Sequence, residues 1–145
     1  MTIPTSADFT IAPPGKHIIQ LFVQFMPYDL DPSIGSWKDP AFKESIANRC
    51  LDIIESYCPG FKKSIIYRDV LSPLDLEKIF GLRKGNIFHG SMSLSQIAYG
   101  RPAPGFSDYS TPLKGLYLCG SGAHPGGGVM GAPGRNCALR VLGNL

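Results

Sequence analysis

A glycine-rich loop is the feature of this chain whose residue types could do chemistry. Residues 116–131, LYLCGSGAHPGGGVMG, place an apolar run, a glycine-dense loop and a helix start in direct succession. Glycines remove the Cβ atoms that keep a phosphate or a planar ring away from the main chain, and a helix start offers free N–H groups and the positive end of its dipole. The pattern predicts a nucleotide-binding loop, although a strand-to-helix turn without a ligand has the same composition.

Side chains that could act beside this loop are few. His89 is a candidate for orienting a substrate or for a structural hydrogen bond, and we expect His124, inside the loop, to brace the backbone rather than to carry protons. Arg101 precedes a proline and is expected to anchor a carbonyl or a carboxylate, with contact to a cofactor or a substrate anion left open. The sequence contains no evident nucleophile or acid–base pair.

Composition is typical of a folded domain, with 43% hydrophobic and 17% charged residues. The net charge of +3 is small and its lysines and arginines are scattered, which argues against a nucleic-acid surface. No apolar run approaches the ~20 residues of a transmembrane helix. The four cysteines lack a C-x-x-C pair, and the spacing of Cys119, His124 and Cys137 fits no common zinc site, so we expect no metal and buried, reduced thiols.

Local signals predict the elements that position the loop. Alternation predicts a strand over 17–26, and apolar runs predict strands over 64–71 and, buried, over 116–119. Asp39 and Pro40 begin a helix that runs to about residue 57, and Ser72, Pro73 and Asp75 begin a shorter one that ends at Gly81. A last helix is expected to begin within a few residues of Val129. The fold class is therefore α/β, or mixed α+β.

Several stretches in order carry a resemblance to a known family. They are 12–28 (APPGKHIIQLFVQFMPY), 58–82 (CPGFKKSIIYRDVLSPLDLEKIFGL), 85–96 (GNIFHGSMSLSQ), Arg101-Pro102, and 115–136 (GLYLCGSGAHPGGGVMGAPGRN). Together they resemble the C-terminal flavin motif and its approaches in the phytoene desaturase and amine oxidase superfamily, in particular the group of pyridine nucleotide-disulfide oxidoreductase domain-containing protein 2. Motifs in a fixed order are more specific than one glycine triplet.

The resemblance implies an FAD-dependent oxidoreductase with a two-domain fold like that of glutathione reductase and amine oxidases. The family's N-terminal dinucleotide-binding βαβ unit, with its G-x-G-x-x-G turn, does not occur between residues 1 and 145. We therefore expect a C-terminal portion whose partner is the missing N-terminal half, and which is inactive alone. Residues 1–98 would belong to the substrate-facing domain, and residues 99–145 would return to the FAD-binding domain.

The resemblance also assigns the cofactor contacts. The backbone of Gly127, Gly128, Val129 and Met130 would face the flavin end of FAD, and Gly120 and Ser121 would approach its ribityl-diphosphate part. The family places the loop of His89 near the reacting side of the flavin. The substrate is unidentified and could be apolar, and the animal proteins of the group suggest a mitochondrial location. The alternative is a stand-alone interaction or nucleotide-binding module without catalytic activity.

Overall fold

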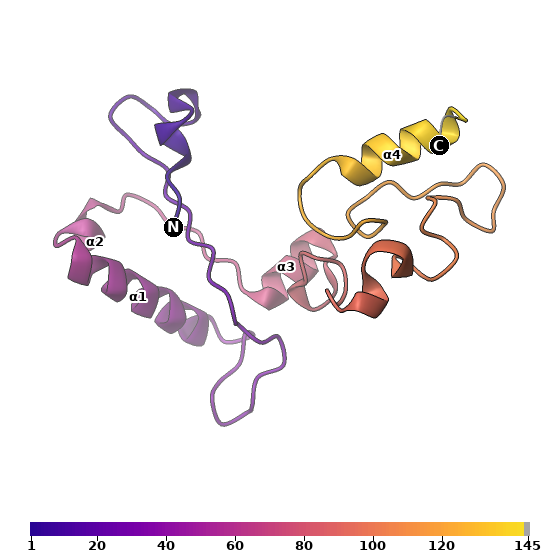
Figure 1. Ribbon diagram of the computed structural model, residues 1–145. Helices are drawn as coiled ribbons and strands as arrows, with labels where there is room; N and C mark the ends of the chain where they lie inside the picture. Colours follow the sequence, from indigo (N-terminus) through magenta and orange to yellow (C-terminus); the bar gives the residue numbers. More distant parts are fainter. Residues whose placement is uncertain (144–145) are drawn as a thin grey trace.

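The computed structural model describes residues 1–143 as short helices joined by long connections (Figure 1). The α-helices are α1 (Pro40–Tyr57), α2 (Phe61–Ser64), α3 (Pro73–Phe80) and α4 (Ala132–Val141). Single 3-10 turns are η1 (Pro4–Ser6), η2 (Phe9–Ile11), η3 (Arg83–Gly85), η4 (Leu94–Gln96) and η5 (Ala98–Gly100). Of the described helices, none combines the length and the apolar character that crossing a bilayer requires.

The helices begin and end where local signals predict. The Asp39 carboxylate accepts from the N–H of Ala41 at the start of α1. Ser72 and Asp75 form the expected capping box at the start of α3, and Gly81 ends that helix in a left-handed conformation. These predictions are confirmed because a cap satisfies free N–H groups with side chains only a few residues away.

The predicted strands are not paired into a sheet within residues 1–143. Residues 17–26 are not helical, Phe25 has a φ of +61°, and among residues 1–143 the run has one β-bridge, between Thr2 and Gln20. Residues 64–71 begin in α2 and continue without a paired strand among residues 1–143. Residues 116–119 make one isolated bridge, between Ser110 and Tyr117. The expected burial of 116–119 is wrong for this structure, since these residues are exposed. A strand needs neighbouring strands that local sequence cannot supply, and among residues 1–143 these runs have isolated bridges at most.

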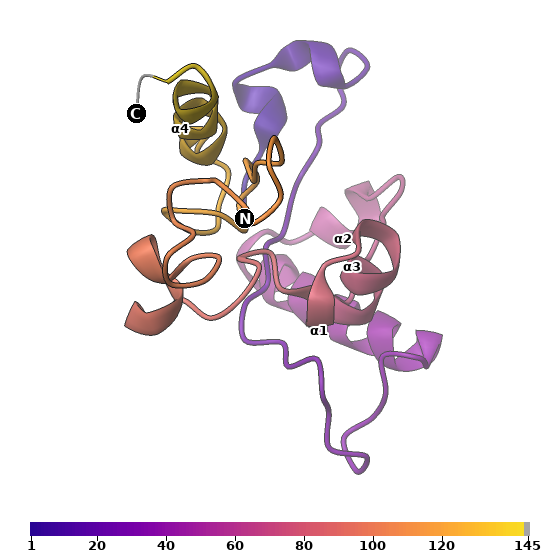
Figure 2. The same cartoon turned by 90° about the vertical axis from the view of Figure 1, so that its right-hand side faces the viewer.

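The molecule has two lobes with little interior (Figures 1 and 2). One contains α1, α2 and α3, and the other contains α4 and the loops before it. Among the described residues, the buried hydrophobic ones are Leu51, Tyr109, Ala123 and Cys137. The expectation of buried thiols is therefore wrong for Cys58 and Cys119, which are exposed, and Cys50 is half-buried. The accessible surface is 10526 Å², whereas a compact monomer of 15.7 kDa exposes about 7,300 Å².

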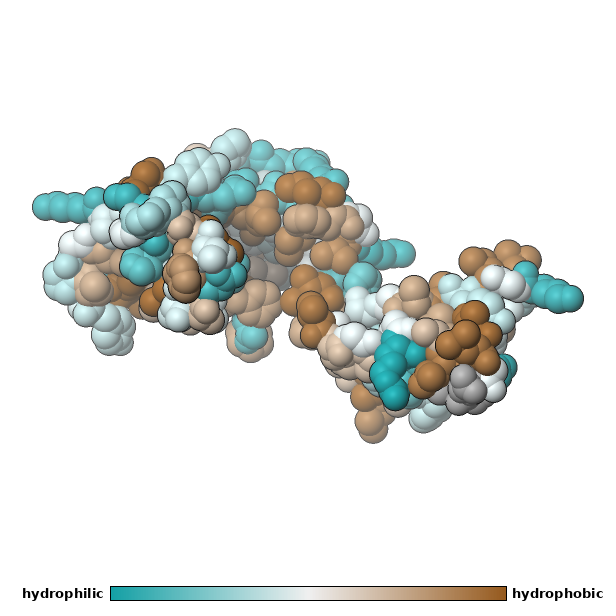
Figure 3. All heavy atoms as spheres, turned by 90° about the horizontal axis from the view of Figure 1, so that it is seen from above, coloured by the Kyte–Doolittle hydropathy of each residue, from teal (hydrophilic) through white to brown (hydrophobic). Residues whose placement is uncertain are grey.

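Many large hydrophobic side chains are exposed. Hydrophobic side chains lie on the outside of both lobes (Figure 3). The extended run at 18–26 is among the most exposed apolar segments, with Phe22 at 66% and Phe25 at 96% exposure. Exposed apolar area of this extent marks surfaces that pack against something else. The mixed α/β class is thus found only in its helical part, and the complete two-domain arrangement remains a prediction.

Candidate functional site

Arg101 organises the loops of the C-terminal lobe. Its side chain is 3% exposed, and each of its five N–H groups has an acceptor. Nε donates to the carbonyl of Gln96 (2.7 Å), Nη1 to those of Phe88 (2.5 Å) and Ser121 (3.4 Å), and Nη2 to that of Ser91 (3.0 Å) and to Sδ of Met92 (3.9 Å). The expectation that Arg101 anchors carbonyl groups is confirmed.

The loop of His89 lies directly against the glycine-rich loop. A Cβ on Gly127 would stand 2.5 Å from the Phe88 Cα and 2.6 Å from the Phe88 carbonyl oxygen, so only glycine permits this approach. A Cβ on Gly122 would lie 3.8 Å from the His89 Cβ. The structure therefore brings His89, Arg101 and the loop of 120–131 together, while their role as one site stays a prediction.

The start of α4 is open. Gly131 precedes it in a left-handed conformation, its first turn has no acidic residue, and no side chain of the described residues 1–143 caps it. Val129 is fully exposed, Met130 is half-exposed, and Gly128 has a φ of +114°. The predicted start within a few residues of Val129 is confirmed, and the helix's free N–H groups and dipole are available to a ligand from outside this chain.

A small buried cluster joins the glycine-rich loop to Tyr109 and α4. Tyr109, Ala123 and Cys137 form it, and the Tyr109 hydroxyl accepts from the Asn136 amide at 2.9 Å. The Leu118 N–H donates to the Tyr109 carbonyl, also at 2.9 Å. Burial raises the pKa of the Cys137 thiol, and the nearby Cys119 raises it further. Sequence analysis missed Tyr109 because its role depends on contacts with residues distant in the chain.

His124 does not brace the loop as predicted. Its Nδ1 atom is buried and has no hydrogen-bond partner among residues 1–143, and its ring packs edge-to-face on Tyr109 with centroids 6.1 Å apart. The loop is held instead by main-chain bonds, including Ala98 N–H to the Pro125 carbonyl at 2.9 Å. Packing on a buried ring supplanted the expected hydrogen bond to backbone.

The remaining predicted cofactor contacts differ in how deeply they are buried. Gly127 is buried against Phe88, whereas Gly120 is exposed and a Cβ there would meet nothing within 4 Å. Ser121 is half-buried, and its carbonyl is directed at Arg101. In the part of the chain that the structure describes, no three His, Cys, Asp or Glu side chains gather as a metal site would require.

Comparison with known proteins identifies the wider context of this site. The chain is 55% identical over all of its 145 residues to pyridine nucleotide-disulfide oxidoreductase domain-containing protein 2 of Rattus norvegicus, of which it covers 25%. It is 32% identical over its whole length to one of the subunits of the limonene dehydrogenase of Castellaniella defragrans, covering 27% of that protein. Over 88% of the chain it is 29% identical to the lycopene-forming phytoene desaturase of Pseudescherichia vulneris, covering 25%.

The chain thus spans about a quarter of the length of the curated relatives it matches. No family model matches it, and no solved structure does. The similarity to the rat protein covers every motif on which the site is built, from the His89 loop through Arg101 to α4. Over its whole length the chain is thus similar to pyridine nucleotide-disulfide oxidoreductase domain-containing protein 2, and it is similar, more weakly, to phytoene desaturase-like oxidoreductases.

Proposed function

We propose that this chain is the C-terminal part of an FAD-dependent oxidoreductase, in which it forms the wall at the flavin end of the cofactor and part of the substrate site. The observation that carries the proposal is the open start of α4 beside a loop of glycines, in a chain 55% identical to a named oxidoreductase. FAD would accept a hydride from the substrate in such an enzyme.

The residues at the loop suit an electron-rich planar group. Gly128, Val129 and Met130 present backbone at the start of α4, where the helix dipole stabilises negative charge without a titratable side chain. Gly120 and Ser121 would approach the ribityl-diphosphate part, and the Cβ direction of Gly120 is open. Gly127 acts differently, because it is already packed on Phe88 and sets the distance between the two loops.

His89 is our candidate for orienting the substrate. It is exposed, it has a φ of +58°, and it lies next to Gly122 of the cofactor loop. Arg101 is not a candidate for binding a substrate anion, because backbone carbonyls and one sulfur already engage its donors. Two relatives are named for limonene and phytoene, both hydrocarbons, which supports an apolar substrate for this chain as well.

The exposed apolar surface favours this proposal over a stand-alone interaction or nucleotide-binding module. A module that works alone buries its hydrophobic residues, whereas the runs at 18–26 and 116–118 are exposed here. In the longer enzyme, these runs would pack on the N-terminal part. The mitochondrial location implied by the resemblance stays a prediction.

The test is a hybrid protein, in which this chain replaces the matching quarter of the rat relative. The 145-residue chain, the hybrid protein and the unmodified rat protein are each purified with FAD, passed through gel filtration and examined by visible absorption. We expect the chain to be colourless and both long proteins to be yellow. FAD that stays on the isolated chain, a folded hybrid that is colourless beside a yellow rat protein, or a colourless rat protein would each contradict the proposal.

A further inference from the structure

The side chain of Arg101 is used in a way that the proposed cofactor contacts do not explain. It is a permanently charged group with 3% exposure, and among residues 1–143 it makes no ion pair with a carboxylate. Burying a charge is costly unless strong hydrogen bonds compensate it. Here the compensation comes from four backbone carbonyls and one sulfur, so Arg101 stabilises a particular arrangement of backbone.

The carbonyl groups that Arg101 joins come from both sides of the site. Phe88 and Ser91 flank the His89 loop, Gln96 ends η4, and Ser121 lies in the cofactor loop. A planar guanidinium fixes the directions of its donors, which the flexible ammonium of a lysine does not. The Arg101 side chain therefore determines how the His89 loop lies on the glycine-rich loop.

The same two loops meet at a second point. The Phe88 carbonyl that accepts from Arg101 is also the group that a Cβ on Gly127 would approach to 2.6 Å. The Gln96 side chain adds a local tie, because its Oε1 accepts from the Ser91 N–H at 3.0 Å. Phe88 is thus held between the guanidinium and the glycine-rich loop.

We infer that Arg101 is a positioning residue: its hydrogen bonds hold the His89 loop against the glycine-rich loop, a contact that we call the clasp, and so fix the backbone that faces FAD. The inference rests on the proposed function for the identity of the cofactor. The clasp itself is a property of this chain, and can be measured without FAD.

The experiment uses the hybrid protein with Arg101→Lys, with Gly127→Ala, and with Arg140→Lys as the matched control. Arg140 is exposed and pairs with the Asp108 carboxylate at 2.9 Å, so its acceptor is not one of the carbonyls that Arg101 engages. Arg101→Lys keeps the charge but loses the fork. Gly127→Ala keeps Arg101 but forces the loops apart, and provides the answer if Arg101→Lys does not fold.

Three measurements are made on each variant. Amide hydrogen exchange over residues 86–100 should become at least about tenfold faster in both clasp variants while α1 is unchanged, since even one lost bond to a charged donor has that effect. The dissociation constant for FAD should also rise at least about tenfold, because the loop arrangement that binds FAD becomes less populated by that factor. The reduction potential of the flavin, measured with excess FAD, should shift in the clasp variants and stay constant in Arg140→Lys.

The outcomes separate the inference from the proposed function. If the unsubstituted hybrid binds no FAD, the proposed function fails, while the exchange measurement still reports on the clasp. Unchanged exchange at 86–100 in a folded clasp variant would overturn the inference. So would faster exchange with an unchanged FAD affinity or flavin potential, because Arg101 would then stabilise the loop without positioning it for the cofactor.

Discussion

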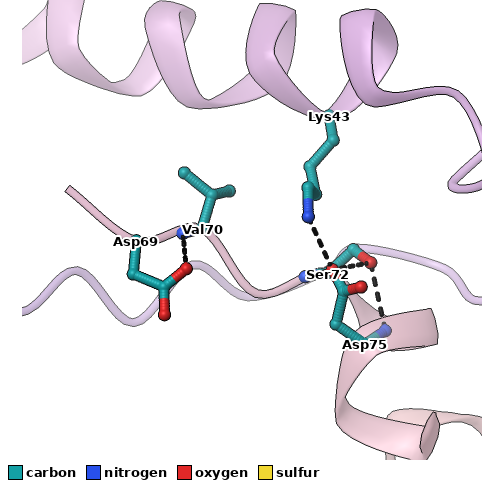
Figure 4. A network of polar contacts seen from close by, with 5 residues as sticks. All are labelled: Lys43, Asp69, Val70, Ser72 and Asp75. Atoms are coloured by element: carbon teal, nitrogen blue, oxygen red, sulfur yellow. Dashed lines mark hydrogen bonds and ion pairs between the residues drawn. The ribbon is translucent and has the colours of Figure 1, made fainter. Parts of the chain in front are cut away.

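Removing the charge of Asp75 should loosen α3 from α1. One carboxylate oxygen of Asp75 accepts from the Ser72 hydroxyl (2.6 Å), the Ser72 N–H (2.8 Å) and the Lys43 ammonium of α1 (3.0 Å), as Figure 4 shows. Partial burial alone would raise the pKa of this carboxyl. The hydrogen bonds from Ser72 and the contact with Lys43 outweigh it, and they lower the pKa from 3.8 to about 2.

The lowered pKa gives both the sign and the size of the effect. A carboxyl whose pKa is lower in the folded state stabilises that state above its unfolded pKa, near 3.8, and the stabilisation is lost as the pH falls through about 2. The difference corresponds to about 2 kcal/mol, or roughly 30-fold in the local unfolding equilibrium. The side chains of Lys43 and Asp75 are each 25% exposed, so solvent screens the pair only in part.

The assay is amide hydrogen exchange in the 145-residue chain, corrected for the intrinsic rate at each pH. The reporters are the N–H groups of Leu76 and Gly81, which donate to the carbonyls of Ser72 and Glu77 at 3.0 and 2.9 Å. Asp75→Asn should lower their protection about 30-fold at pH 6 and remove its pH dependence between 4 and 2. Asp69→Asn is the control, because the Asp69 carboxylate accepts from the N–H of its own neighbour Val70 and not from Ser72 or Lys43. Protection in Asp75→Asn equal to that of the unsubstituted chain, or a persistent acid transition, would refute the reasoning.

Three further predictions concern the site. In the hybrid protein, Gly128→Val should abolish FAD binding, because a φ of +114° costs a β-branched residue about 1–3 kcal/mol. Gly120→Ala should weaken FAD binding but leave the melting temperature of the FAD-free protein unchanged. Visible absorption measures the bound FAD of both variants, and thermal melts measure their stability. His124→Ala should keep the flavin and lose about 1 kcal/mol of stability with its ring contact, measured by urea unfolding; loss of FAD would make His124 a ligand. Cys137 should resist iodoacetamide in the folded protein while the exposed Cys58 reacts, because burial raises the pKa of the Cys137 thiol; mass spectrometry after labelling would show equal reaction if this is wrong.

The sequence predicted those features whose causes lie within a few residues. Asp39 with Pro40, and Ser72 with Asp75, begin helices because each cap bonds to N–H groups two or three residues away. The anchoring role of Arg101 followed from its chemistry, but its particular acceptors did not. Phe88 and Tyr109 escaped notice because they matter only through approaches between segments far apart in the chain.

The failure of the predicted strands and the excess of surface have one explanation. Residues 17–26 carry the alternation of a strand, and 116–119 carry the apolar run of a buried one, yet each makes only one isolated bridge among residues 1–143. The surface exceeds that of a compact protein of this mass by about 3,200 Å², which is the size of a large obligate interface. A sequence selected to stand alone would not combine strand patterning with unpaired, exposed apolar segments. The polar contacts at Arg101 and Asp75 hold the local geometry of each lobe, and under the proposed function the missing hydrophobic contacts are those that packing against the rest of a longer oxidoreductase would provide.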